Sequence, residues 1–225
     1  MTDASDTPDL YEGIMTTRAI RRFTDEPVSD DDVLAVLRAA QQAPSGGNVQ
    51  PWQFVVVTEP ETRSVVGEQY RTAYHRYEAA MLPTVPPFRS GDDQTSWDRT
   101  LRASRHLADH LAEVPVLIAV CMPDISLTLS DSEGELDIGP LTASVFPAVQ
   151  NLMLAARSRG LGTALTTVFR INHDELREAL GIPQAYQVMA LVPLGHPSGR
   201  FGVARRRSVE SVTHWNRWGE RRRPV

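Results

Sequence analysis

The residues best suited to chemistry gather near the start of the chain, where a cluster of arginines precedes a glycine-rich turn. Arg18, Arg21 and Arg22 lie within five residues, and the turn Pro44-Ser45-Gly46-Gly47-Asn48 follows about one helix later. Arginine side chains bind phosphate, and a turn of small residues exposes backbone N–H groups to an anion or a ring. Alone, the arginines are typical of a solvated surface and the turn of an ordinary loop. Together they predict a site for an anionic ligand with a flat ring.

Several other chemistries lack the residues that they need. The chain has no lysine, which removes Schiff-base and lysine general-base catalysis. Its only cysteine, Cys121, lies in the apolar run VPVLIAVCM, which predicts a buried thiol and not a nucleophile. No HExxH metal motif and no GxSxG nucleophile elbow occurs, so no metal is expected. The chemistry is therefore expected to come from a bound cofactor.

Flavin mononucleotide (FMN) meets these requirements. Its phosphate carries roughly two negative charges at neutral pH, its ring is flat, and reduction places negative charge near N1 and O2 of the ring. Arg18 and Arg21 are three residues apart, so at a helix end or turn they can point to one side. A further basic cluster, Arg205-Arg206-Arg207, can close over the same phosphate from far along the chain. We therefore predict FMN as the cofactor.

Length and composition set the class of protein. The chain has 225 residues, of which 41% are hydrophobic, enough for one domain with a substantial core. A formal net charge of −5 argues against nucleic-acid binding, which needs a basic surface. No apolar run approaches the ~20 residues of a membrane span, and the acidic N-terminus lacks a secretory pattern. A cytoplasmic protein without nucleic-acid or membrane partners is expected.

Interleaved helix and strand patterns predict a single α+β domain over residues 1–225, with a mixed central sheet flanked by helices. Ser29 and the three aspartates after it are typical of a helix start, and Asn172 with Glu175 resembles a capping box. The expected helices are residues 9–17, 30–43, 59–80, 98–112 and 141–160 with a short one after Asn172, and the expected strands are residues 52–57, 115–121, 162–168 and 186–195.

The remaining segments are expected to be irregular. Residues 1–8 are predicted to form a loose tail, and residues 198–225 an arm that runs over the surface or onto a partner. The Pro-rich stretch 82–97 lacks periodicity and is long for a compact domain, which indicates a lid or a loop. Residues 124–138 are predicted to be a polar loop.

Three blocks of the sequence, taken in order, resemble the FMN-dependent nitroreductase family. Residues 16–57 resemble its opening block RRSxRxF…PV…APSxxNxQPWxF, SVFPAVQNLMLAARSRGLGTALTT resembles its central helix and next strand, and VMALVPLGHPS with RRRSVESV resembles its closing block. Such an ordered set is far more specific than any single piece. The resemblance implies an intertwined homodimer with FMN at the interface. It also implies that NAD(P)H reduces nitroaromatic or quinone-like acceptors by a ping-pong mechanism. NADPH is slightly favoured, because Arg71, Arg76 and Arg89 are suited to its 2′-phosphate.

The resemblance also assigns roles to residues of these blocks. Arg18, with Arg205 or Arg206, is expected to meet the phosphate, and Arg21 the ring near N1 and O2. No side chain is expected to act as a catalytic acid or base. The resemblance implies that Gly47 borders the acceptor-binding side of the site. Phe88 and Trp97 are expected there as well, because their rings are able to stack on a flat acceptor. The other expected FMN contacts are Ala19, Arg22, Leu165, Thr166 and Thr167, with Ser45, Gly46 and Asn48 from the partner subunit.

Departures from the family pattern leave alternatives open. Ala19 stands where the family has serine, and Ser208 where proline often follows the last basic cluster, so the phosphate-binding arginine among residues 205–207 stays open. Within the family, a flavin-fragmenting synthase of a cobalamin ligand and a reductive dehalogenase are alternatives, although the dehalogenase lid uses a lysine that is absent here. A non-catalytic flavin-binding interaction protein is an alternative of another class, suggested by the arginine-rich RWGERRRPV.

Overall fold

The fold is built around a sheet that carries helices on both faces. The computed structural model describes residues 7–222. The sheet has the order β1-β2-β6-β5, with β1 (Gln53–Val57), β2 (Val116–Pro123), β5 (Gly162–Thr163) and β6 (Tyr186–Gly195). The helices are α1 (Leu10–Thr16), α2 (Asp30–Ala40), α3 (Pro60–Met81), α4 (Gly91–Asp109), α5 (Val145–Ser158) and α6 (His173–Ala179).

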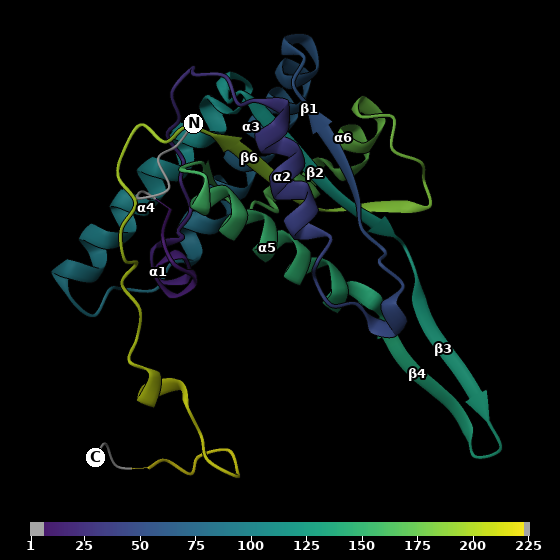
Figure 1. Cartoon of the computed structure of the whole chain (residues 1–225). Coiled ribbons are helices and arrows are strands. Elements are labelled where there is room, and N and C mark those ends of the chain that lie inside the picture. Colours follow the sequence, from purple (N-terminus) through teal and green to yellow (C-terminus); the bar gives the residue numbers. More distant parts are fainter. Residues whose placement is uncertain (1–6, 223–225) are drawn as a thin grey trace.

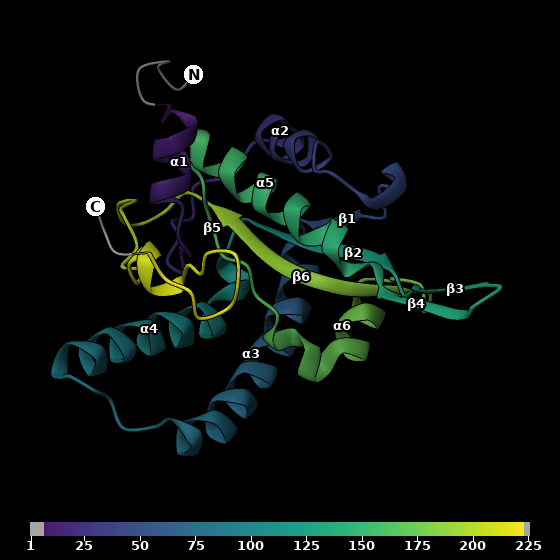
Figure 2. The same cartoon turned by 90° about the horizontal axis from the view of Figure 1, so that it is seen from below.

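Two apolar layers hold the helices to the sheet. Alternate residues of β2 point to opposite faces, so Ile118 and Val120 pack under α2 and α5, while Leu117 and Ala119 pack under α3 and α4. All four side chains are fully buried. Figure 2 shows the resulting three layers, with α2 and α5 on one side of β6 and α3, α4 and α6 on the other. The α+β class is confirmed, and the predicted helix over residues 141–160 is observed as α5.

The sheet itself differs from the expectation. All its pairings within residues 7–222 are antiparallel, so the expected mixed sheet is not formed by this chain. The predicted strand 162–168 is only two residues long, with an isolated bridge from Thr166 to Leu191 beyond it. Strand β1 lies at the edge of the sheet within this chain, and its Gln53 and Val56 are exposed.

Two predicted loops contain regular structure. Helix α4 begins at Gly91, where the Ser90 hydroxyl accepts a hydrogen bond from the Asp93 backbone at 3.2 Å, so only residues 82–90 of the stretch 82–97 lie outside a long helix. The polar stretch 124–138 forms a hairpin of β3 (Ser126–Asp131) and β4 (Gly134–Pro140). The capping box after Asn172 is absent, since its side chain makes no hydrogen bond to the first turn of α6, and its Nδ2 donates to the Gln69 carbonyl.

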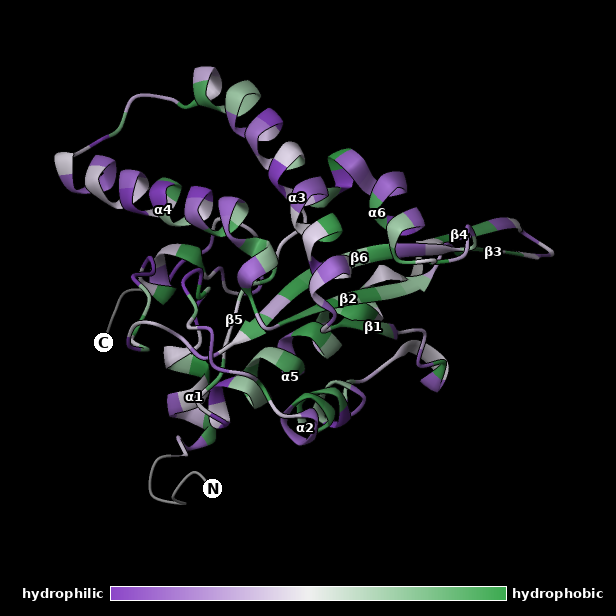
Figure 3. Cartoon of the chain, turned by 90° about the horizontal axis from the view of Figure 1, so that it is seen from above, coloured by the Kyte–Doolittle hydropathy of each residue, from purple (hydrophilic) through white to green (hydrophobic). Residues whose placement is uncertain are grey.

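Parts of the chain project from the three layers. Figure 1 shows the β3–β4 hairpin and the C-terminal arm leaving the body separately, and Figure 3 shows α4 as largely hydrophilic while β2 and β6 are hydrophobic. The arm, residues 198–222, contains only a short 3₁₀ turn at Val209–Val212. Among residues 7–222, no helix combines the length and the hydropathy needed to cross a bilayer.

Candidate functional site

The arginine cluster is fixed against the end of the sheet. The backbone N–H of Ile20 donates to the Thr163 carbonyl at 2.8 Å, and that of Thr24 donates to the His196 carbonyl at 2.9 Å. Gly162 makes this close approach feasible, because a Cβ there would lie 2.8 Å from the Ile20 side chain. Since Ile20 is buried against the sheet, its neighbour Arg21 is held at a defined place.

Arg21 enters a cavity of about 250 Å³ between α3, α4 and the segment after β5. Its side chain is half-buried, and this burial lowers the pKa of Arg21, although a guanidinium stays protonated at neutral pH. No carboxylate within residues 7–222 forms an ion pair with it. A partly desolvated cation without a partner favours an anionic ligand. The cavity is lined by Arg21, Tyr70, Tyr74, Tyr77, Met81, Trp97, Thr100, Leu101, Ser104, Leu165, Thr166, Thr167 and Val168.

The structure therefore joins Arg21 to the predicted ring-contacting segment 165–167. Thr166 is committed to the fold, since its hydroxyl donates to the Leu191 carbonyl at 2.8 Å and its backbone N–H donates to the same oxygen at 3.1 Å. Leu165 and Thr167 stay exposed in the cavity. Of the three residues, these two keep side chains that are free to touch a ligand.

The predicted phosphate contacts lie outside this cavity. Arg18, Ala19 and Arg22 are exposed, and an Nη2 of Arg18 donates to the Arg200 carbonyl at 3.4 Å. Arg205 and Arg206 are exposed on the C-terminal arm. Arg18 thus lies beside the start of the arm, while its joint contact with Arg206 on a phosphate stays a prediction.

The glycine-rich turn lies at the opposite end of α5 from Arg18. The Gly46 backbone N–H donates to the Ser144 hydroxyl at 3.3 Å, just before α5 begins. At the other end, Arg157 donates to the Thr16 hydroxyl at 3.0 Å, two residues before Arg18. Fourteen helical residues rise about 21 Å. One chain therefore does not bring the turn, residues 44–48, to its own Arg21 cavity.

The turn itself is shaped to expose backbone. Gly47 has φ +58°, a left-handed conformation that favours glycine. The Ser45 hydroxyl accepts a hydrogen bond from the Gln50 backbone at 3.0 Å, which closes the loop. Gly46, Gly47 and Asn48 are exposed, so the loop is accessible to a neighbouring molecule.

Of the two aromatic residues predicted on the acceptor side, Trp97 lines the Arg21 cavity and Phe88 does not. Phe88 packs against Trp97 instead, with 6.0 Å between ring centroids. Trp97 belongs to the first half of α4 and not to a loop. The cavity wall at this point is therefore a helix held by an aromatic pair.

Sequence reasoning missed a buried polar network beside the cavity. The carboxylate of Glu78 is 7% exposed and accepts hydrogen bonds from Arg105 Nε at 2.7 and 2.8 Å. It also accepts one from the Tyr74 hydroxyl at 3.1 Å. Burial, and next the nearby Glu78 charge, raise the pKa of Tyr74, so the phenol keeps its proton. The signal was the spacing of Tyr70, Tyr74 and Glu78, which places all three on one face of α3.

A histidine pair at HxxxH spacing was also overlooked. His106 and His110 have ring centroids 4.3 Å apart, and His110 Nδ1 lies 2.8 Å from a Glu113 oxygen. Within the described range, no group of three His, Cys, Asp or Glu side chains is arranged to hold a metal ion. The pair therefore adds no candidate metal centre.

Comparison with known proteins places the chain in a family. The model of the nitroreductase family matches residues 14–196, and the chain belongs to this family. An NADH dehydrogenase/NAD(P)H nitroreductase of Archaeoglobus fulgidus is 30% identical over 82% of this chain and 83% of its own length. Nitrobenzene nitroreductase of Ectopseudomonas oleovorans is 28% identical over 84% of this chain and 86% of its own. Rat iodotyrosine deiodinase 1 is 27% identical over 84% of this chain, which spans 62% of that protein.

Solved structures agree on the fold. Iodotyrosine deiodinase bound to FMN and 3-iodo-L-tyrosine superposes with a TM-score of 0.68 over 93% of this chain and all of that chain, at 23% identity. The FMN- and NADPH-dependent nitroreductase NfnB superposes with a TM-score of 0.67 over 92% of this chain and 99% of that chain, at 20% identity. The chain is thus a nitroreductase-family flavoprotein of α+β fold.

Proposed function

We propose that this protein is an FMN-dependent oxidoreductase in which NAD(P)H, with NADPH slightly favoured, reduces nitroaromatic or quinone-like acceptors by a ping-pong mechanism. The observation that carries the proposal is the half-buried Arg21, without a carboxylate partner in residues 7–222, in one cavity with Leu165 and Thr167. Such a cation suits the part of a flavin that gains negative charge on reduction.

The chain's own residues then act by binding and positioning. When bound, FMN supplies hydride transfer between the nicotinamide and the acceptor. Arg21 supplies fixed positive charge in a site where burial strengthens electrostatic interactions. Tyr70 and Tyr74 are almost fully buried and form an apolar wall that excludes water, and Trp97 offers a face for a flat acceptor. No side chain needs to act as an acid or base at the transferred hydride.

The complete site is shared between two copies in this proposal. The turn with Ser45, Gly46 and Asn48 is about one α5 length away from Arg18 in the same chain. A two-fold partner with α5 reversed brings its turn to this chain's arginines. FMN binding and dimer formation are then linked by mass action.

The preference for NADPH rests on exposed arginines of α3 and of the segment between α3 and α4. Arg76 and Arg89 are exposed and suited to a 2′-phosphate. Arg71, which the sequence also offered, pairs with Glu68 at 2.7 Å and is a weaker candidate. A substitution of Arg76 by Ala is expected to raise the KM for NADPH and leave that for NADH unchanged.

Steady-state kinetics of the FMN-loaded protein test the proposal. NADPH and NADH are varied at several fixed concentrations of nitrobenzene or menadione, and the initial rates of nicotinamide oxidation are recorded. Parallel double-reciprocal lines are expected, because the nicotinamide leaves before the acceptor binds. Intersecting lines would reject the ping-pong order, and an absence of turnover with every acceptor would reject the enzyme activity.

A further inference from the structure

The β3–β4 hairpin is acidic and has an exposed apolar face. Its register places Leu129 opposite Leu136, and Ile138 lies next along the same strand. These side chains are 49%, 44% and 59% exposed. Between residues 124 and 139 there are five carboxylates and no basic residue, so the apolar face is bordered by negative charge alone. An isolated two-stranded hairpin is marginally stable in water, so this face favours a covering partner.

The C-terminal arm has the complementary character. Residues 198–222 contain seven arginines against two glutamates. Val209 and Trp218 are 67% and 91% exposed, although the Trp218 ring stacks on His214 with centroids 4.1 Å apart. The Arg222 guanidinium lies 3.7 Å from the centre of the Trp215 ring. The arm thus offers apolar and basic groups together, and Figure 1 shows it leaving the helices and strands of the body.

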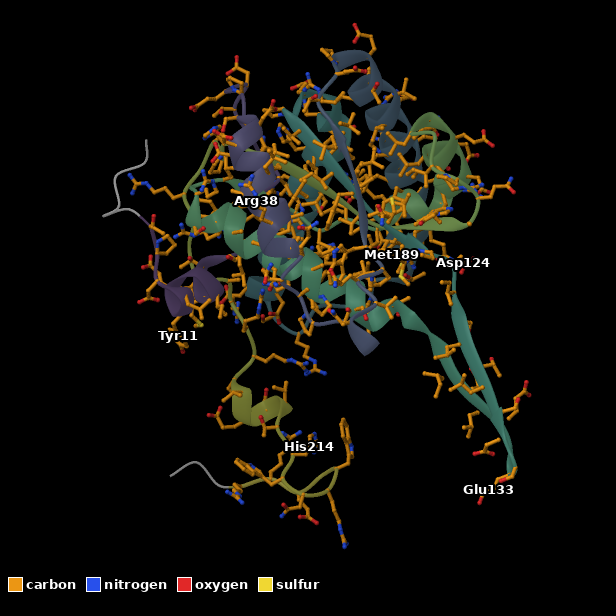
Figure 4. All side chains as sticks on the ribbon, turned by 45° about the vertical axis from the view of Figure 1, so that its right-hand side comes forward. Tyr11, Arg38, Asp124, Glu133, Met189 and His214 are labelled. Carbon is orange, nitrogen blue, oxygen red and sulfur yellow. The ribbon has the colours of Figure 1, made fainter. Side chains whose placement is uncertain are left out.

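The hairpin and the arm leave the body from opposite ends of α5. Strand β4 ends at Pro140, and a short 3₁₀ turn, Leu141–Ser144, leads directly into α5. At the other end of α5, the Arg157 guanidinium lies 4.2 Å from the centre of the Phe201 ring at the start of the arm. Figure 4 shows Glu133 at the tip of the hairpin and His214 on the arm, both projecting from the body.

A two-fold pairing that completes the proposed site brings the bases of these two segments to the same end of α5. The turn 44–48 shares the N-terminal end of α5 with the hairpin, through the Gly46–Ser144 hydrogen bond. Arg18 shares the C-terminal end with the arm, through its hydrogen bond to Arg200. When reversal of α5 brings the turn of one copy to the arginines of the other, the base of the first copy's hairpin comes to the base of the second copy's arm.

We infer that the acidic β3–β4 hairpin of one copy docks against the basic C-terminal arm of a second copy of this chain, with Leu129, Leu136 and Ile138 covered by apolar residues of the arm. This inference rests on the shared site of the proposed function. The opposite charges steer the two segments together and fix the pairing, while the apolar contact supplies most of the affinity. The dimer contact therefore weakens at high salt.

A charge exchange tests the pairing. Glu133→Arg with Glu135→Arg reverses two of the five negative charges of the hairpin, Arg217→Glu with Arg222→Glu reverses two of the seven positive charges of the arm, and the fourfold variant carries both pairs. None of these residues is assigned to FMN or the acceptor. Glu175→Arg with Glu178→Arg on α6 makes the same charge change away from both segments and is the matched control. Subunit exchange between isotope-labelled and unlabelled FMN-loaded dimers is followed by native mass spectrometry.

Each two-residue reversal is expected to speed subunit exchange about tenfold, because the two reversed side chains of one segment then face like charges of the other in both symmetric contacts. The fourfold variant is expected to return close to the parent rate, and the α6 control to match the parent. An unchanged rate in either reversal, a fourfold variant that exchanges faster still, or a parent protein that is monomeric would overturn the inference.

FMN content and its reduction by NADPH are measured on the same samples. If NADPH still reduces the bound FMN while the reversals leave subunit exchange unaffected, the docking is rejected and the proposed function stands. If the parent protein does not bind FMN, the proposed function itself is rejected.

Discussion

Arg105 holds the buried carboxylate of Glu78 through its Nε atom, at 2.7 and 2.8 Å from the two carboxylate oxygens. This contact joins α4 to α3 across the wall of the Arg21 cavity. It also fixes the Tyr74 hydroxyl, which donates to the same carboxylate. Neither Glu78 nor Arg105 lines the cavity, but their ion pair holds Tyr74, which does. The shape of the cavity therefore depends on this ion pair.

Substitution of Glu78 by Gln is expected to destabilise the fold and loosen the cavity wall. The loss of the charged acceptor from a buried network costs about 1–3 kcal/mol, which is roughly 2–12 °C in thermal midpoint for a chain of this size. The acceptor KM is expected to rise with kcat nearly unchanged. Glu68→Gln is the control, because its ion pair with Arg71 on the same helix is exposed and worth little. Equal midpoints for the two variants would contradict the structural role of Glu78.

Substitution of Arg21 by Ala is expected to lower the midpoint potential of bound FMN. A charge-assisted contact is worth about 1.5–3 kcal/mol, which corresponds to about 30–60 mV for a two-electron couple. Arg38→Ala, on the exposed side of α2, removes the same charge far from the cavity and is expected to leave the potential unchanged. Spectroelectrochemistry of the fully FMN-loaded variants provides the measurement. An Arg21→Ala potential equal to that of Arg38→Ala would reject the assigned position.

Trp97 is expected to bind the acceptor by stacking. Because α4 begins at Gly91, a point substitution tests this wall with less damage than a loop deletion. Trp97→Ala is expected to raise the acceptor KM about fivefold to tenfold, in line with about 1–1.5 kcal/mol for an aromatic pair. Trp97→Phe keeps an aromatic face and is expected to recover most of the affinity. If Ala and Phe variants share the parent's KM, Trp97 does not contact the acceptor.

Cys121 gives the protein a defined pH dependence of stability. Burial raises the pKa of its thiol from 9.0 to about 11. Between these pH values the folded chain keeps a proton that the unfolded chain has lost, so stability falls as pH rises through this window, by up to about 1.4 kcal/mol per pH unit. Tyr70 and Tyr74 titrate in the same direction, so the comparison is with Cys121→Ala. The stability advantage of the parent over Cys121→Ala is expected to shrink from pH 8 to pH 11, and a constant difference would contradict the thiol's burial.

Much of the fold was predictable because amphipathic periodicity and capping agree locally. In α2, Ser29 caps the helix and Val33 and Val36 are buried, as the pattern indicated. The hairpin was missed because its few apolar residues, such as Leu129 and Ile138, stand among polar ones, and the stretch therefore resembles a loop. These apolar side chains stay exposed, so the core of this chain does not depend on them. The early start of α4 was missed because Gly91 and the polar residues after it show no apolar periodicity. This part of the helix projects from the body and buries no side chain in the core.

The site was predictable in part for a similar reason. Arg21 and the segment 165–167 lie in local motifs, and the structure brings them together. The spacing of Tyr70 and Tyr74 indicates one shared face of α3 but does not show that this face lines a cavity, and Arg105 lies in a long polar helix without such a pattern. Their proximity depends on how α3 and α4 pack, which is a tertiary property. The turn 44–48 was recognised locally, but its distance from Arg18 follows from the length of α5 between them.

The proposed FMN chemistry is tested most directly by anaerobic absorbance spectroscopy of the purified, FMN-loaded protein. One equivalent of NADPH is added, the flavin absorbance near 450 nm is followed, and nitrobenzene or menadione is added afterwards. The account predicts that NADPH bleaches the flavin band and that the acceptor restores it without added oxygen. A flavin band that NADPH and NADH leave unchanged, or a bleached band that neither acceptor restores, would contradict the account.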